Sequence, residues 1–234
     1  MYLTRAYLNP RRRGAIRLLG HPQRLHAAVL AGFPPLPDGK RVLWRLDTDQ
    51  PHRPVLWIVS PYQPDLAHLT EQAGWPASDA PQWETRPYES LLKRLDRGQQ
   101  YAFRLTDNPT RALPPAEPGT RGKRVEHVTV GHQMAWLLAQ ADNAGFRVLI
   151  NDAHLPGTKE PALQLQLRDR DKIRFTKKNH PGVVTIGRVT YEGMLQVTDP
   201  DPLRQAMTQG IGRARAYGCG LLTLANRLPN AQAR

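Results

Sequence analysis

The order of strand-like and helix-like segments in the first half of the chain constrains the fold most. Four runs rich in aromatic and β-branched residues predict strands, at 2–8, 42–46, 55–60 and 101–105. Leu25, Val29 and Leu30 lie at helical spacing after His21-Pro22, so this segment predicts a helix that stops near Gly32. A weaker helix is expected around 65–73, and Arg11–Gly14 is interpreted as a basic loop.

The resulting order is strand, helix, strand, strand, helix, strand, which is the order of a ferredoxin-like unit. The second half repeats this theme. Its best helix is Gln133–Asn143, with Gly145 as a cap, and a further helix is expected at 203–208. Strands are expected at 125–130, 163–167, 173–175, 183–189, 194–197 and 221–224. We therefore predict an α+β protein of two tandem ferredoxin-like (RRM-like) domains, each an antiparallel sheet with two helices. The expected boundaries are 1–112 and 122–234, with a Pro- and Gly-rich linker at 113–121.

The charge of the chain indicates a polyanionic partner. There are 33 Lys and Arg residues against 20 Asp and Glu, a formal net charge of +13. Nucleic acid is the first candidate, although charge alone fits RNA, DNA or an acidic membrane surface. No apolar run approaches the roughly 20 residues that a membrane span needs, and Met1–Arg5 lacks the apolar region of a signal peptide. We expect a cytoplasmic protein without a membrane partner.

Metal and cofactor chemistry has little support in the sequence. The single cysteine, Cys219, excludes a disulfide framework and disfavours a thiolate metal site. The eight histidines show no metal-ligand spacing, since the pairs His21/His26 and His127/His132 are each five residues apart. We therefore expect no metal and no cofactor. Trp44, Trp57, Trp136 and Cys219 are interpreted as core residues.

A glycine-rich segment at 209–220 is the most informative motif. Glycine lets backbone N–H groups approach a phosphate, and arginine offers it two parallel donors. The residues of this type are Gly210, Gly212, Arg213, Arg215, Gly218 and Gly220. The segment is not a Walker loop or a dinucleotide fingerprint, and by spacing alone it fits an ordinary turn equally well.

Two basic clusters could extend a track for a polyanion. The first, at 168–182, holds Arg174, Lys177 and Lys178 and reaches a hairpin tip at Pro181-Gly182. The second is Arg11, Arg12 and Arg13. The alternatives are a solvated hairpin and a merely solubilising loop.

The glycine-rich segment and the Leu221–Ala225 run after it resemble the signature loop of CRISPR repeat-processing endoribonucleases, most closely the CasE family of type I-E systems. Other matching stretches follow in the family's order: Met1–Thr4, Arg24–His26, Leu43–Leu46, Tyr101–Leu105 with Asn108-Pro109, Ala135–Leu137 and Tyr191–Leu195. The resemblance spans nearly the whole chain. It implies two ferredoxin-like domains, metal-independent cleavage of a CRISPR repeat stem-loop RNA, and retention of the product with the other Cascade subunits.

The resemblance also implies roles for particular residues. His26 lies in the segment similar to the family's catalytic-histidine segment, and imidazole titrates near neutrality, which suits proton transfer. RNA supplies its own nucleophile, the 2′-OH, so the implied products carry a 5′-OH and a 2′,3′-cyclic phosphate. In the family a basic hairpin lies against the RNA stem, which implies this position for Arg174, Lys177 and Lys178.

The sequence departs from the family at one position near His26. Many members carry a tyrosine three residues before this histidine, and this chain has Gln23, which cannot exchange a proton usefully near neutral pH. Tyr2, Tyr217 and His21 are unranked candidates for a proton-transfer partner. Two alternatives stay open: a catalytically inactive RNA-binding subunit of the guide complex, and a metal-dependent nuclease.

Overall fold

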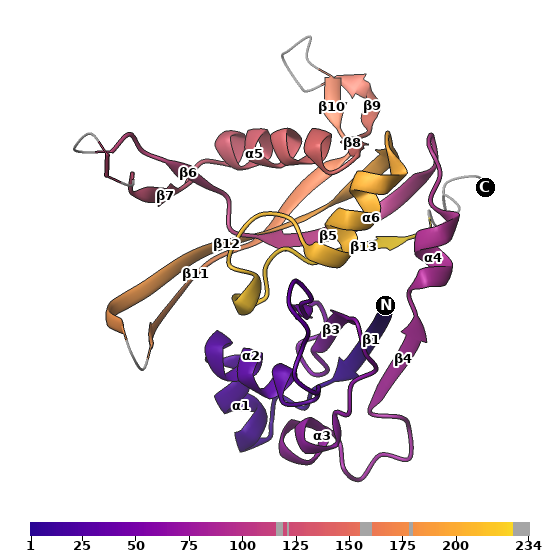
Figure 1. The fold of residues 1–234 in the computed structure, drawn as a ribbon, viewed down its shortest axis with the longest axis vertical. Helices are drawn as coiled ribbons and strands as arrows, with labels where there is room; N and C mark the ends of the chain where they lie inside the picture. Colours follow the sequence, from indigo (N-terminus) through magenta and orange to yellow (C-terminus); the bar gives the residue numbers. More distant parts are fainter. Residues whose placement is uncertain (116–118, 121, 155–160, 178–179, 227–234) are drawn as a thin grey trace. The chain divides into compact units, whose positions relative to one another are not determined.

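The computed structural model describes residues 1–115, 119–120, 122–154, 161–177 and 180–226 (Figure 1). The chain divides into two compact units. Unit 1 comprises Met1–Arg94 and Thr208–Leu221, and unit 2 comprises Leu95–Met207 and Leu222–Arg234. This division differs from the predicted boundaries of 1–112 and 122–234. The glycine-rich segment, although close to the C-terminus, belongs to unit 1.

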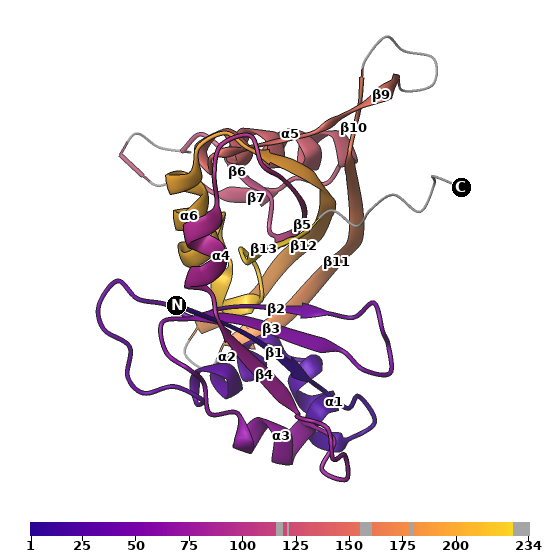
Figure 2. The same cartoon turned by 90° about the vertical axis from the view of Figure 1, so that its right-hand side faces the viewer.

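Unit 1 contains a four-stranded antiparallel sheet in the order β2-β3-β1-β4. Its strands are β1 (Tyr2–Tyr7), β2 (Leu43–Asp47), β3 (Val55–Ser60) and β4 (Trp83–Pro87). Its helices are α1 (Arg13–Leu19), α2 (Pro22–Leu30), α3 (Ala67–Ala73) and α4 (Glu89–Arg94), with the 3-10 turn η1 (Arg215–Tyr217). The strand order is that of a ferredoxin-like fold, with α1, α2 and α3 on one side of the sheet (Figure 2).

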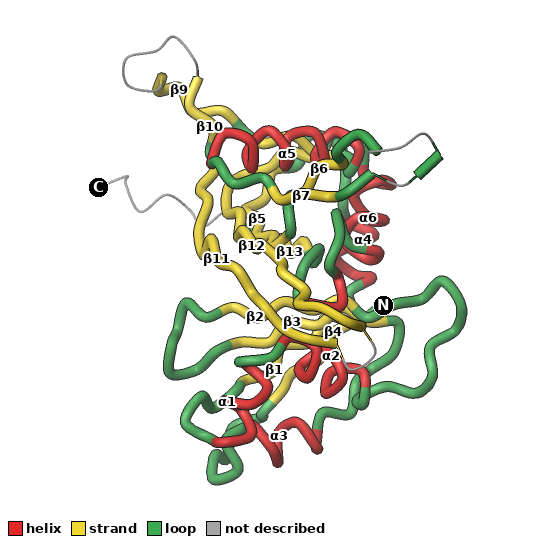
Figure 3. The backbone as a smooth tube through the Cα atoms, turned by 90° about the vertical axis from the view of Figure 1, so that its left-hand side faces the viewer, coloured by secondary structure: helices red, strands yellow, loops and turns green. Residues whose placement is uncertain are grey.

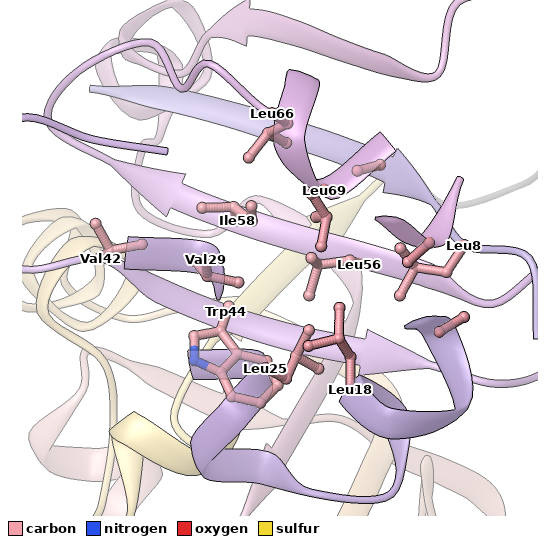
Figure 4. Close-up of a cluster of buried hydrophobic side chains, with 13 residues drawn as sticks. Leu8, Leu18, Leu25, Val29, Val42, Trp44, Leu56, Ile58, Leu66 and Leu69 are labelled. Carbon is pink, nitrogen blue, oxygen red and sulfur yellow. The ribbon is translucent and has the colours of Figure 1, made fainter. Parts of the chain in front are cut away.

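The core of unit 1 lies between this face of the sheet and these three helices. Alternate residues of β1 and β3, such as Ala6, Leu56 and Ile58, are buried against it. Leu25 and Val29 of α2 pack there beside the ring of Trp44, which is 1% exposed (Figure 4). The interpretation of Trp44 as a core residue is thus confirmed.

The prediction of a basic loop at Arg11–Gly14 is wrong in part, because α1 begins at Arg13. The helix has no side-chain cap at its start and no acidic residue in its first turn, so its sequence carries no start signal. Tertiary packing forms it instead: Ala15 and Leu18 are buried, and Gly14 approaches Gln72 so closely that a Cβ would lie 2.1 Å from the Gln72 carbonyl oxygen.

The prediction that Tyr101–Leu105 completes the first sheet is also wrong. The fourth strand of unit 1 is β4, whose pairing with β1 depends on cross-strand contacts. Thr85 hydrogen-bonds Thr4 through their hydroxyls at 2.8 Å, and Glu84 forms an ion pair with Arg5 at 2.9 Å. Tyr101–Leu105 lies in β5 (Gln100–Asp107), the first strand of unit 2.

Unit 2 contains a five-stranded antiparallel sheet (Figure 3). In it β5 pairs with both β12 (His180–Val197) and β13 (Leu222–Ala225), and β12 also pairs with β8 (Phe146–Val148) and β11 (Leu165–Lys177). The order β13-β5-β12-β8 with helices α5 (Val130–Asn143) and α6 (Pro200–Gln209) is again ferredoxin-like. The predicted fold class is therefore confirmed.

Two long strands replace the four short ones predicted at 163–197. β11 and β12 form one antiparallel hairpin, with register shifts between Arg168 and Asp171 and between Thr176 and Lys177. Two small sheets complete unit 2: β6 (Thr110–Ala112) pairs with β7 (Arg124–Glu126), and β9 (Ile150–His154) pairs with β10 (Pro161–Leu163). Part of the predicted linker, 116–118 and 121, lies outside the described residues. None of the helices in the described ranges is long and apolar enough to cross a bilayer.

Candidate active site

His26 lies in the middle of α2, on unit 1. The helix starts with Pro22 at its first position, where the missing N–H costs no hydrogen bond, and its buried side is formed by Pro22, Leu25 and Val29. His26 follows Leu25 and is half-buried at the edge of this apolar side. Gln23 is three residues earlier and therefore on the same side of the helix, also half-buried.

The ring of His26 is held by a side chain of β2. The indole Nε1–H of Trp44 donates a hydrogen bond to Nδ1 of His26 at 3.2 Å. Trp44 itself is fixed in the core, so this contact ties the orientation of the imidazole to the sheet.

Burial lowers the pKa of His26 from its ordinary value of 6.5. The cause is desolvation, which disfavours the charged imidazolium. Neither α1 nor α2 nor η1 carries a carboxylate that would stabilise a positive ring. The environment of His26 therefore favours the neutral ring at neutral pH.

The glycine-rich segment folds into a compact loop in unit 1. Gly210, Gly212, Gly218 and Gly220 have positive φ angles, and Ala214 adopts the same left-handed region. The η1 turn inside the loop packs against α2 and β2. Arg215 Nη2 donates to the carbonyl oxygen of Gly210 at 2.9 Å and so closes the loop from within.

Gly218 joins the loop to the neighbourhood of His26. Its φ is +81°, and a Cβ at this position would lie 2.7 Å from Cζ3 of Trp44. Only glycine allows the loop to come this close to the indole ring. Trp44 therefore contacts the loop with its ring and His26 with its N–H.

Arg45 anchors the end of the same loop. It is 2% exposed, donates through Nη1 to the carbonyl oxygen of Leu221 at 3.0 Å, and forms an ion pair with Asp47 at 2.7 Å. Because Trp44 and Arg45 are consecutive in a strand, they point to opposite faces of the sheet. Neither contact can be predicted from the sequence, where Trp44 has the pattern of a core residue and Arg45 that of an ordinary strand position.

Some of the predicted basic residues of unit 1 are exposed to solvent, and others donate hydrogen bonds to the backbone of the unit. Arg11, Arg13 and Arg213 are exposed to solvent. Arg12 instead donates through Nη1 to the carbonyl oxygens of Thr70 and Gly74, at 3.1 and 3.3 Å. Arg12 and Arg215 thus stabilise the fold of unit 1, whereas the exposed arginines present their charge outward.

The predicted basic hairpin belongs to unit 2. Arg174 is exposed on β11, opposite Thr185 of β12. Lys177 ends β11, but its side chain and the whole of Lys178 lie outside the described residues. At the base of the hairpin, Arg188 pairs with Asp171 at 2.6 Å.

The unranked proton-transfer candidates occupy three different elements. Tyr217 is in η1, His21 precedes α2 at its N-cap, and Tyr2 begins β1, where it pairs with Ser60 of β3. Of these elements, η1 packs against α2. Among the described residues, no group of three or more His, Cys, Asp or Glu side chains is placed to hold a metal ion.

Comparison with known proteins gives consistent results. A family model described as CRISPR associated protein matches residues 1–226. The chain is 30% identical over 230 residues to the CRISPR-associated endoribonuclease Cse3 of Thermus thermophilus, covering 96% of this chain and all of that protein. It is 28% identical over 205 residues to the CRISPR system Cascade subunit CasE of Escherichia coli K12, covering 78% of this chain and 94% of that one.

The solved structures agree. The structure of Thermus thermophilus Cse3 bound to an RNA representing a pre-cleavage complex matches with a TM-score of 0.74 and 28% identity, covering 96% of this chain and 98% of that chain. Cas6e from Escherichia coli K-12 shares the fold, with a TM-score of 0.63 and 22% identity over 97% of this chain and all of that chain. The chain therefore belongs to the CRISPR-associated protein family, as a member of its CasE/Cse3 group of type I-E systems.

Proposed function

We propose that this protein is an endoribonuclease that cleaves CRISPR precursor RNA at the repeat stem-loop. The observation that carries the proposal is the contact of Trp44 with both His26 and the glycine-rich loop, which places the proposed proton-transfer residue and the proposed phosphate-binding loop beside the same indole ring. One relative supports it twice: Cse3 is named as an endoribonuclease, and its structure has been solved with an RNA representing a pre-cleavage complex.

The proposed reaction uses the nucleophile of the RNA itself. The 2′-oxygen attacks the adjacent phosphorus and the bond from phosphorus to the 5′-oxygen breaks. One proton leaves the 2′-OH, and one proton reaches the departing 5′-oxygen, giving a 2′,3′-cyclic phosphate and a 5′-OH. His26 is the proposed proton-transfer residue, because imidazole can exchange protons near neutral pH. No metal or cofactor is needed for this balance of protons.

The proposed role of the glycine-rich loop is to hold the reacting phosphate. Loop N–H groups and the exposed Arg213 offer donors to the charge that develops on the phosphorane. The closing contact of Arg215 with Gly210 keeps the loop in one conformation before the RNA binds.

The RNA stem is proposed to lie along the basic hairpin of unit 2, through Arg174, Lys177 and Lys178. Arg11 and Arg13 of unit 1 are proposed as separate phosphate contacts. These side chains would contact phosphates, since the deep major groove of A-form RNA limits base reading.

Replacing Lys177 and Lys178 by alanine should weaken stem binding and flatten its dependence on salt, because fewer counterions are released. Arg97→Ala, an exposed charge after α4, is the control. If the binding affinity of the double variant depends on salt as steeply as that of wild type, neither lysine contacts the RNA phosphates.

Retention of the product is the proposed second task. Phosphate contacts to the stem survive cleavage, so the mature guide RNA should stay bound and enter the Cascade complex in the cytoplasm. The name of the Escherichia coli relative, a Cascade subunit, supports this assignment.

The direct test is cleavage of a repeat RNA by the purified protein in EDTA. Cleavage at the stem that is lost in His26→Ala, and lost with a 2′-deoxy nucleotide at the scissile position while binding persists, is the expected result. Cleavage of the deoxy substrate would exclude 2′-OH attack. Activity that EDTA abolishes and magnesium restores would instead establish a metal-dependent nuclease.

Gln23 favours one second candidate, an inactive RNA-binding subunit of the guide complex. Glutamine can hold a hydrogen bond but cannot transfer a proton at this position. Tight binding of the repeat without any cleavage under the same conditions would establish this alternative and refute the enzymatic proposal.

A further inference from the structure

The hydrogen bond between Trp44 and His26 has a defined direction. An indole nitrogen can only donate, so Nδ1 of His26 is the acceptor of the 3.2 Å contact. A ring nitrogen that accepts a hydrogen bond carries no proton. The neutral imidazole has a single N–H, and it must therefore lie on Nε2.

We propose that Trp44 is a positioning residue of the active site that holds His26 as the neutral tautomer with its proton on Nε2. The neutral ring then offers the RNA an Nε2–H that can donate a hydrogen bond to the reacting phosphate. Transfer of this proton to the 5′-oxygen requires that Nδ1 is first protonated, so that the ring is left neutral after the transfer. Only this consequence for cleavage rests on the proposed function, because the tautomer of His26 is a property of the protein alone.

Trp44 is rigid enough to impose this state. Its ring is 1% exposed, belongs to the core between the sheet and the helices, and is contacted by Gly218 on the loop side. The indole ring cannot rotate its N–H away from Nδ1 of His26 without disturbing the packing of that core. If Nδ1 became protonated, two N–H groups would face each other and the contact would be lost.

Most of the charges on the neighbouring elements are positive. The charged and titratable side chains there are Arg13 and Arg17 of α1, His68 and Glu71 of α3, Arg215 and Tyr217 of η1, and Arg45 and Asp47 of β2, which pair with each other. His21 and Arg24 are on α2 itself or at its cap. Burial is what lowers the pKa of His26, and it favours the neutral ring.

The experiment is an NMR titration of the histidine rings in wild type and Trp44→Phe. The phenyl ring stays apolar and removes the donor, together with part of the ring that contacts Gly218. In wild type, Nδ1 of His26 should have the chemical shift of an unprotonated nitrogen, and the Trp44 indole signal should titrate with the midpoint of His26. In Trp44→Phe both tautomers should appear, and the pKa of His26 should rise by about half to one unit, the equivalent of one modest hydrogen bond.

Trp57→Phe is the matched control. Trp57 lies in β3 between Leu56 and Ile58, which face the core, so its ring is on the other face of the same sheet. This variant should leave the tautomer and the pKa of His26 unchanged. If Trp44→Phe also leaves both unchanged, the proposal is wrong.

Cleavage gives a second readout. The limb of the pH–rate profile that reports His26 should shift to higher pH by the same amount in Trp44→Phe and not in Trp57→Phe. If Trp44→Phe does not fold, the wild-type titration alone decides the matter, since a protonated Nδ1 in the neutral ring would overturn the proposal. Failure of wild type to cleave RNA would refute the proposed function and leave the tautomer measurement valid.

Discussion

Trp44 and Arg45 are neighbours in β2 and reach different partners from opposite faces of its sheet. Trp44 donates to His26 and lies against Gly218, whereas Arg45 donates to the carbonyl oxygen of Leu221. The dipeptide Trp44-Arg45 therefore contacts the chain at Gly218, near the end of the glycine-rich loop, and at Leu221, directly after the loop. Residues that look like ordinary strand positions thus determine where the candidate catalytic groups stand.

Gly218→Ala should lower both stability and RNA cleavage. The new Cβ would lie 2.7 Å from the Trp44 ring, and the backbone φ of +81° is costly for alanine. Gly39→Ala is the matched control, since its φ is +74° with no atom within 4 Å of the new Cβ. We expect Gly39→Ala to cost about 1 kcal/mol and Gly218→Ala about 1–3 kcal/mol more. Equal losses in urea unfolding would show that the loop yields without disturbing Trp44.

The stability of the protein should depend on pH through His26. Its pKa in the folded state is lowered from 6.5, so the unfolded chain binds a proton more readily than the folded one. The contribution of the neutral ring is fully present above pH 6.5 and is lost as pH falls through the lowered folded-state pKa. The difference in unfolding free energy between wild type and His26→Ala should therefore grow with pH over this window. A difference that is flat across the window would contradict the burial of the ring.

At the scale of elements, β2 is both a core strand and the support of the glycine-rich loop. Arg45→Met keeps a long apolar stem in place and removes the guanidinium, leaving Asp47 and the Leu221 carbonyl without this donor. We expect a loss of about 3 kcal/mol in urea unfolding, with a clear fall in RNA cleavage. Arg41→Met, at an exposed position before β2, should change stability by less than about 0.5 kcal/mol. Similar small effects in both variants would mean that the loop does not depend on Arg45.

Helices whose own sequence carries periodic apolar residues and end signals were predicted. Helices and strands that form only by packing or pairing with another segment were not. The helix predicted at Gln133–Asn143 is α5, because its apolar positions and the following Gly145 are local signals. By contrast, α1 has no capping signal and forms by packing Ala15 and Leu18 into the core. Strand β4 is polar, and only its pairing with Thr4 and Arg5 of β1 makes it a strand.

At the scale of the whole molecule, the chain passes from one unit to the other three times. It leaves unit 1 after Arg94, returns at Thr208 and leaves again after Leu221. A fragment of residues 1–94 therefore lacks the loop that contacts Leu43 and Trp44. We expect this fragment to unfold at lower urea concentration than the same fragment fused through a flexible linker to residues 208–221. Identical midpoints would show that the loop adds nothing to the stability of unit 1.

The amino-acid sequence is enough to predict the α+β class, the two ferredoxin-like domains and the basic character, and to suggest His26 and the glycine-rich loop as candidates. Periodicity, charge and the order of short motifs are local properties of the chain. Which strand completes each sheet cannot be predicted in this way, because β4 and β5 are assigned by their pairing partners. The tertiary structure also decided that the loop, nearly two hundred residues after His26 in the chain, belongs to the same unit. The link between them is the indole of Trp44, whose hydrogen bond and ring contact depend on three segments meeting in space.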